Sequence, residues 1–167
     1  MVITDAATGD ANVKALVYVD AFIPNQGQSA GELINAVPGT WVAAPNLVAV
    51  PYPGAPSGSV EDYITASSWP WCFANGPSPA EAAQTYAVQR PLPSIALTQK
   101  SGVPAWKSIP SWAVVGTADH AIPPAELLAM AKTAGAKVSK VDAGHLSMVT
   151  DPGVVTRVIL RAAKATT

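Results

Sequence analysis

The chain has 167 residues, of which 49% are hydrophobic and only 13% are charged. This composition predicts one folded domain with a buried core and excludes a disordered tail. The formal net charge is −1 and there is no run of lysine or arginine, so the sequence lacks the basic surface of proteins that bind nucleic acids or anionic membranes.

The single cysteine, Cys72, excludes an intramolecular disulfide. No apolar run reaches the roughly 18 residues that a membrane-spanning helix needs, and no signal-peptide pattern opens the chain. We therefore expect a cytoplasmic protein with one cysteine that is not cross-linked within the chain.

The first residues predict the end of a helix over 1–7, with Gly9 in the place of a C-cap glycine. Residues 13–19 follow as a nearly continuous apolar and β-branched run. Such a run is typical of a parallel strand that is covered on both faces. A strand of this kind needs neighbours in a sheet.

Residues 24–110 contain 13 of the 16 prolines and four of the five tryptophans. Because proline interrupts regular elements, this segment is expected to form an irregular lid rather than a sheet. Short helices are predicted over 28–36, 59–67 and 79–89.

A regular alternation of strands and helices follows residue 110. Strands are predicted over 112–115 and 137–141, and a helix runs from Pro123 and Pro124 to Gly135. Asp151 and Pro152 begin a last helix, whose apolar face is expected to comprise Val154, Val155, Val158, Ile159 and Ala162. The pattern indicates the α/β class, a parallel sheet flanked by helices.

Two polar residues follow predicted strands directly, Asp119 in one loop and His145 in the next. Ligands of open α/β sheets bind beyond the carboxyl ends of the strands, so both side chains are expected at one edge of the sheet. An aspartate can orient an imidazole that takes a proton from a serine hydroxyl, and the chain order of acid then histidine is that of α/β-hydrolases.

Three segments carry a family resemblance: 114–124 (Val-Val-Gly-Thr-Ala-Asp-His-Ala-Ile-Pro-Pro), 141–145 (Val-Asp-Ala-Gly-His) and 15–22 (Ala-Leu-Val-Tyr-Val-Asp-Ala-Phe). They resemble small bacterial esterase-like α/β-hydrolases, which are similar to plant salicylate esterases and hydroxynitrile lyases. The resemblance implies that Asp119 is the catalytic acid and His145 the base. It also implies a core formed by 1–24 and 109–167, and a cap formed by 25–108.

By the same resemblance the substrate is a small apolar ester, and Phe22, Trp71 and Leu146 are expected to contact it. No cofactor or metal is implied. The lyases of this family carry a lysine directly after the histidine, where this chain has Leu146. That departure favours an esterase over cyanohydrin cleavage, which remains an alternative chemistry.

The family nucleophile lies in a Gly-His-Ser-x-Gly-Gly turn that would fall just before Met1. The chain is therefore expected to correspond to the C-terminal half of the fold, and to need either the N-terminal half or self-association. Residues 27–31 (Gly-Gln-Ser-Ala-Gly) match the Gly-x-Ser-x-Gly pattern. Their serine does not follow a strand directly, so Ser29 is interpreted as a helix N-cap rather than a nucleophile.

Other residues have structural interpretations. Asp20, also at a strand end, is the fallback acid. His120 beside Asp119 lacks the further ligands that a metal site needs, and Cys72 lacks a basic neighbour that would lower its pKa. A non-enzymatic chain, either truncated or binding an apolar ligand, is the alternative to a serine hydrolase.

Overall fold

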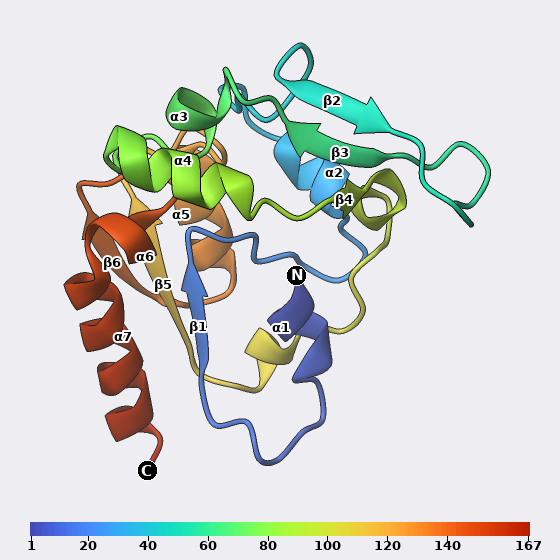
Figure 1. The fold of residues 1–167 in the computed structure, drawn as a ribbon. Coiled ribbons are helices and arrows are strands. Elements are labelled where there is room, and N and C mark those ends of the chain that lie inside the picture. Colours follow the sequence, from blue (N-terminus) through green and yellow to red (C-terminus); the bar gives the residue numbers. More distant parts are fainter.

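Two sheets organise the chain, and the computed structural model describes all residues from 1 to 167. The core sheet is parallel, in the order β1 (Leu16–Val19), β5 (Ser111–Gly116) and β6 (Lys137–Val141). Figure 1 shows most of the segment between β1 and β5 as a second layer above the carboxyl ends of these strands; its last part descends beside the N-terminal helix to β5. The architecture is the predicted α/β class.

Helices cover both faces of the core sheet. Trp112 and Val114 of β5 pack in the apolar cluster of helix α7 (Pro152–Ala165), whereas Ala113 and Val115 pack in that of α5 (Pro124–Thr133). Successive strand side chains point to opposite faces, so all six residues of β5 are buried. β5 is the central strand of this sheet.

The predicted ends of both long helices are present. Gly135 follows α5 with a φ of +62°, a left-handed conformation that glycine adopts without strain. Asp151 caps α7 by accepting a hydrogen bond from the N–H of Val154, at 3.1 Å. Ile159, which was expected on the apolar face of this helix, is 48% exposed, while Val155 and Val158 on the same face are buried.

β1 also differs from the prediction of a strand covered on both faces. Leu16 and Tyr18 are buried, but Val17 and Val19 are only half-buried. The reason is that β1 pairs with β5 alone, which leaves its other edge and part of one face without a neighbour. The exposed side chain of Ile159 lies on the same side of the sheet, because Val17 and Ile159 line one groove.

The layer above the sheet corrects two predictions. It contains an antiparallel sheet of β2 (Leu47–Val50), β3 (Glu61–Ile64) and β4 (Leu92–Pro93), although no sheet was expected, and β3 replaces the helix predicted over 59–67. The prolines of the β2–β3 connection lie in its loop, so they do not interrupt the strands. Pairing with β2 decides the conformation of residues 61–64.

The same layer holds the helices predicted near 28–36 and 79–89, which are α2 (Ala30–Ile34) and α4 (Pro79–Ala87). Short α3 (Trp69–Cys72) and the 3₁₀ turn η1 (Ser94–Leu97) complete it, whereas the 3₁₀ turn η2 (Ala105–Lys107) lies beside the N-terminal helix and packs in the core (Figure 1). The division into a core of 1–24 and 109–167 and a cap of 25–108 stays a prediction.

Two one-turn helices complete the chain. α1 (Val2–Ala6) occupies the predicted N-terminal helix, and α6 (Ser147–Thr150), which was not predicted, begins two residues after His145. None of the helices combines the length and the apolar character that crossing a membrane requires.

Candidate active site

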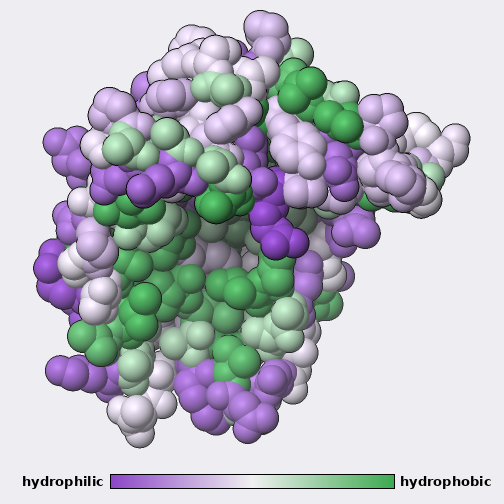
Figure 2. Space-filling model, in the orientation of Figure 1, coloured by the Kyte–Doolittle hydropathy of each residue, from purple (hydrophilic) through white to green (hydrophobic).

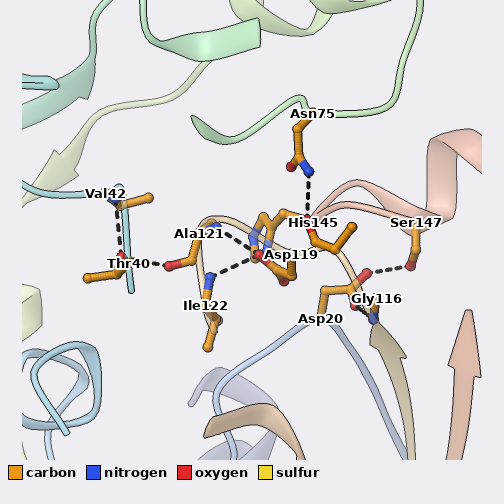
Figure 3. Close-up of polar contacts among 11 residues, drawn as sticks. Asp20, Thr40, Val42, Asn75, Gly116, Asp119, Ala121, Ile122, His145 and Ser147 are labelled. Carbon is orange, nitrogen blue, oxygen red and sulfur yellow. Dashed lines mark hydrogen bonds and ion pairs between the residues drawn. The ribbon is translucent and has the colours of Figure 1, made fainter. Parts of the chain in front are cut away.

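Three polar residues lie just beyond the carboxyl ends of the core strands: Asp20 after β1, Asp119 after β5 and His145 after β6 (Figure 3). Because the strands are parallel, their carboxyl ends meet at one edge of the sheet. The expected juxtaposition is present.

The Asp119 carboxylate accepts three hydrogen bonds. Its Oδ2 lies 2.8 Å from Nδ1 of His145, and its Oδ1 accepts the backbone N–H groups of Ala121 and Ile122 at 2.8 and 2.9 Å. The Asp119 side chain is fully buried and that of His145 is 14% exposed. Bonds to the backbone fix the carboxylate, and the carboxylate in turn fixes the imidazole.

This arrangement selects a tautomer of His145. A carboxylate only accepts, so Nδ1 carries the proton that it donates to Asp119, and the tautomer of the neutral imidazole that fits this contact has its lone pair on Nε2. No side chain or backbone group of the chain hydrogen-bonds Nε2. The imidazole is therefore set up to accept a proton at Nε2.

His145 borders a cavity of about 830 Å³ between the core sheet and the layer above it. Most lining residues are apolar; Phe22 and Ile122 come from the core, and Ile34, Phe73 and Leu97 from the layer above. The ring of Phe73 meets the imidazole edge to face, with centroids 4.5 Å apart. The cavity can hold an apolar molecule against His145.

Of the three residues expected to contact substrate, only Phe22 lines this cavity. Trp71 is 41% exposed and donates its indole N–H to the carbonyl of Ser67. Leu146 packs against an apolar cluster of the upper layer that contains Trp69. Sequence reasoning missed Phe73, two residues beyond Trp71, because only the orientation of α3 shows which aromatic ring faces His145.

Asn75 joins the upper layer to both loops of the site. Its Nδ2 donates to the carbonyl of Ala118 at 2.7 Å, while its Oδ1 is buried without a hydrogen-bond donor. Gly144, directly before His145, lies so close that an added Cβ would overlap the backbone and side chain of Asn75. No sequence signal pointed to this contact, which joins residues distant in the chain.

Ser29 is the N-cap of α2. Its hydroxyl accepts the N–H of Glu32 at 3.3 Å, and the Glu32 carboxylate accepts the N–H of Ser29 at 2.9 Å. This reciprocal pair is a capping box, which satisfies two backbone donors at a helix start. The Gly-x-Ser-x-Gly match at 27–31 thus has a structural explanation.

His120 does not take part in the Asp119–His145 hydrogen bond. Its Nδ1 is 2.7 Å from the carbonyl oxygen of Trp71, in an exposed position. No group of three or more histidine, cysteine, aspartate or glutamate side chains is arranged to hold a metal ion.

Cys72 is completely buried, and burial, with a smaller effect from Asp119, raises the pKa of its thiol to about 11. At pH 8 only about one thiol in a thousand is then the reactive thiolate. We expect the native chain to resist iodoacetamide at pH 8 and the urea-unfolded chain to take up one label, as measured by intact mass. Equal labelling rates in the two states would contradict this burial.

Solved structures share this fold. Polyneuridine aldehyde esterase is 15% identical with a TM-score of 0.72, and the match covers 90% of this chain and 62% of that one. For tomato methylketone synthase I, in complex with 2-tridecanone, the values are 14%, 0.71, 92% and 62%. For a pyrethroid hydrolase from Sphingobium faniae JZ-2 they are 17%, 0.66, 96% and 65%.

The chain thus spans somewhat under two thirds of the length of each of these proteins. No curated protein sequence matches it. The model of the alpha/beta hydrolase family, however, matches residues 1–158, which include all three core strands and both Asp119 and His145. The chain belongs to the α/β-hydrolase family.

Proposed function

We propose that the protein hydrolyses carboxylic esters with apolar substituents, and that Asp119 and His145 are the acid and base of a serine hydrolase. The observation that carries this proposal is the buried Asp119–His145 hydrogen bond, which leaves Nε2 of His145 free beside an apolar cavity. An ester needs both features, a base at the reacting bond and an apolar wall for its acyl and alcohol groups.

In the proposed reaction, Nε2 of His145 takes the proton of a serine hydroxyl while the serine oxygen attacks the ester carbonyl. The resulting imidazolium is stabilised by Asp119 and returns the proton to the departing alcohol. A water molecule, deprotonated by the same nitrogen, then attacks the acyl-serine, and the imidazolium returns that proton to the serine oxygen as the acid leaves. Each proton that His145 accepts is given back within the cycle.

The serine is proposed to come from another polypeptide segment. No serine hydroxyl of the chain hydrogen-bonds Nε2 of His145, and Ser29 is engaged in the cap of α2. A segment that brings such a serine has to reach the carboxyl edge of the sheet, where His145 lies.

The open edge of β1 is the proposed docking site for this segment. Leu16 and Asp20 donate their N–H groups towards β5, to Pro110 and Val114 at 3.0 and 3.1 Å. Because successive peptide groups of a strand alternate in direction, those of Val17 and Val19 point to the open edge. A further strand can hydrogen-bond there.

The two open edges of the core sheet differ in chemistry. β6 carries Lys137 and Lys140, charges of the kind that discourage strand addition, whereas all four residues of β1 are apolar or aromatic. An apolar groove of about 440 Å³ runs along β1, lined by Ile3, Ala6, Ala7, Val13, Ala15, Leu16, Val17 and Ile159. Figure 2 shows apolar side chains gathered on the lower part of this face of the molecule. This edge therefore suits a covering polypeptide better than the edge of β6.

The serine's origin is tested with a fluorophosphonate probe, which labels activated serines. Residues 1–167 are co-expressed with a segment containing a strand and a Gly-His-Ser-x-Gly-Gly turn, and hydrolysis of p-nitrophenyl butyrate is measured. We expect hydrolysis by the pair and a label on the serine of the added segment. Hydrolysis by residues 1–167 alone, with the label on Ser29, would overturn this assignment.

The docking edge is tested by Val17→Asp, which places a charge in the groove beside β1. We expect it to abolish co-purification with the serine-bearing segment. The matched control is Val138→Asp, which alters a valine of β6 that is 41% exposed and should leave co-purification unchanged. Equal effects of the two variants on co-purification would contradict docking of the serine-bearing segment at β1. A homodimer of residues 1–167 that Val17→Asp disrupts would show that a second copy of the chain occupies this edge instead.

An apolar cavity without catalysis would suit a ligand-binding protein instead. The discriminating result is saturable binding of p-nitrophenyl butyrate by the assembled pair of polypeptides with no release of p-nitrophenol. That outcome would replace the hydrolase proposal.

A further inference from the structure

Asp20 is a buried acid that the reaction proposed above does not use. It follows β1 directly, is only 2% exposed and has a φ of +44°. A residue with a side chain seldom adopts positive φ, although aspartate tolerates it better than most. The surrounding structure therefore has to hold this backbone in place.

The carboxylate of Asp20 holds two other segments of the site together (Figure 3). Its Oδ1 accepts the N–H of Gly116 at 2.6 Å, and its Oδ2 accepts the hydroxyl of Ser147. Gly116 ends β5, three residues before Asp119, and Ser147 begins α6, two residues after His145. One side chain thus connects the end of β1 to the loops that carry both members of the pair.

Packing around Gly116 leaves little freedom at this junction. A Cβ added there would lie 2.7 Å from the carbonyl oxygens of Ala143 and Gly144 and 3.2 Å from Oδ1 of Asp20. The hydrogen bond from Gly116 to Asp20 therefore forms where the loops before Asp119 and His145 already touch. Loss of this hydrogen bond would therefore alter the conformation of both loops.

Asp20 makes no salt bridge, and it is not the acid that holds His145, since Nδ1 of His145 bonds to Asp119. Burial raises the pKa of its carboxyl, while the hydrogen bonds from Ser147 and Gly116 oppose that rise. A carboxyl group that is buried without a cation is costly. Its contacts here are those of a structural hydrogen-bond acceptor.

The geometry points to Asp20 as a positioning residue, which keeps the His145 loop in register with the Asp119 loop through Ser147 and Gly116. This inference rests on the proposed function only for the identity of the reaction. Without the contacts of Asp20 to Gly116 and Ser147, the imidazole of His145 no longer keeps Nδ1 directed at Asp119. A displacement of about 1 Å at such a pair can reduce catalysis on the order of 100-fold.

The test follows the tautomer of His145, which needs no catalysis. The chain has only two histidines, so ¹⁵N-histidine labelling gives two rings, and His120→Gln assigns them. In the unaltered chain we expect His145 to show a protonated Nδ1 and a bare Nε2. Asp20→Ala and Ser147→Ala should each convert this pattern into the averaged shifts of a mobile ring.

Asp20→Asn is the rescue variant. Its amide can accept from Gly116 through the oxygen and donate to the Ser147 hydroxyl through the nitrogen, so the fixed tautomer should persist. Asp142→Asn is the matched control, an exposed aspartate at the end of β6, and should change nothing. Circular dichroism establishes that each variant is folded.

The outcomes separate the two proposals. A folded Asp20→Ala or Ser147→Ala variant that retains the fixed tautomer overturns the positioning role, whether or not any ester is hydrolysed. Averaged shifts in the unaltered chain also overturn it, because there is then no fixed pair to position. If the fixed tautomer depends on Asp20 but no ester is cleaved, only the proposed reaction fails.

In an active assembly, kcat should fall about 10- to 100-fold in Ser147→Ala, with KM unchanged.

Discussion

Replacing His145 with alanine is expected to lower p-nitrophenyl butyrate hydrolysis by the assembled enzyme by about 10⁴- to 10⁶-fold, because the acid, the base and the nucleophile act as one unit. Asp119 would keep its bonds from Ala121 and Ile122, so the loop should remain folded. Steady-state kinetics and circular dichroism together measure this expectation.

Asp119→Asn should cause a loss of similar size for a different reason. The asparagine oxygen can accept the same backbone N–H groups, but its amide nitrogen would donate to Nδ1 of His145. The proton would then sit on Nε2, which could no longer accept one from serine. The expected result is an intact fold with reversed ¹⁵N shifts of the two ring nitrogens.

His120→Ala is the control for both variants, because His120 is the only other histidine and lies in an exposed position. It should retain activity within about twofold, as exposed substitutions away from a site have small effects. An active His145→Ala enzyme, or a His120→Ala enzyme as inactive as His145→Ala, would refute the assigned base.

Gly144→Ala is the substitution expected to perturb the structure most. The added Cβ would overlap Asn75, whose backbone cannot yield as a flexible side-chain end can. Either the segment around Asn75 or the loop of His145 must move. Overpacking of this kind costs about 1–3 kcal/mol, and the upper end is expected here. Urea unfolding gives the free-energy change, and the ¹⁵N signals of His145 show whether its loop has moved.

Gly153→Ala is the matched glycine control. Gly153 lies in α7, where an added Cβ meets only the Arg157 side chain, at 3.3 Å, and the Asp151 carboxylate, at 3.5 Å. A helical glycine replaced by alanine gains about 1 kcal/mol in helix propensity. We therefore expect Gly153→Ala to be neutral or stabilising. A Gly144→Ala chain as stable as the Gly153→Ala chain would show that the contact with Asn75 is not tight.

Local sequence patterns predicted the strands and long helices of the core and the placement of Asp119 and His145. Alternating apolar residues, helix caps such as Asp151 and the position of Gly135 depend on neighbours within a few residues, so the sequence displays them directly. The placement of Asp119 and His145 at one edge of the sheet was predicted in the same way, because each follows a strand and parallel strands bring their carboxyl ends together, whereas their roles as acid and base were assigned from the family resemblance.

Contacts between distant segments required the tertiary structure. The pairing of residues 61–64 with β2 outweighed the local pattern that had predicted a helix, and the orientation of α3 placed Phe73 rather than Trp71 against His145. Ile159 fits the apolar face of α7, but whether that face is covered depends on what lies beside β1. These outcomes depend on which surfaces meet in space, and residue spacing along the chain carries no information about that.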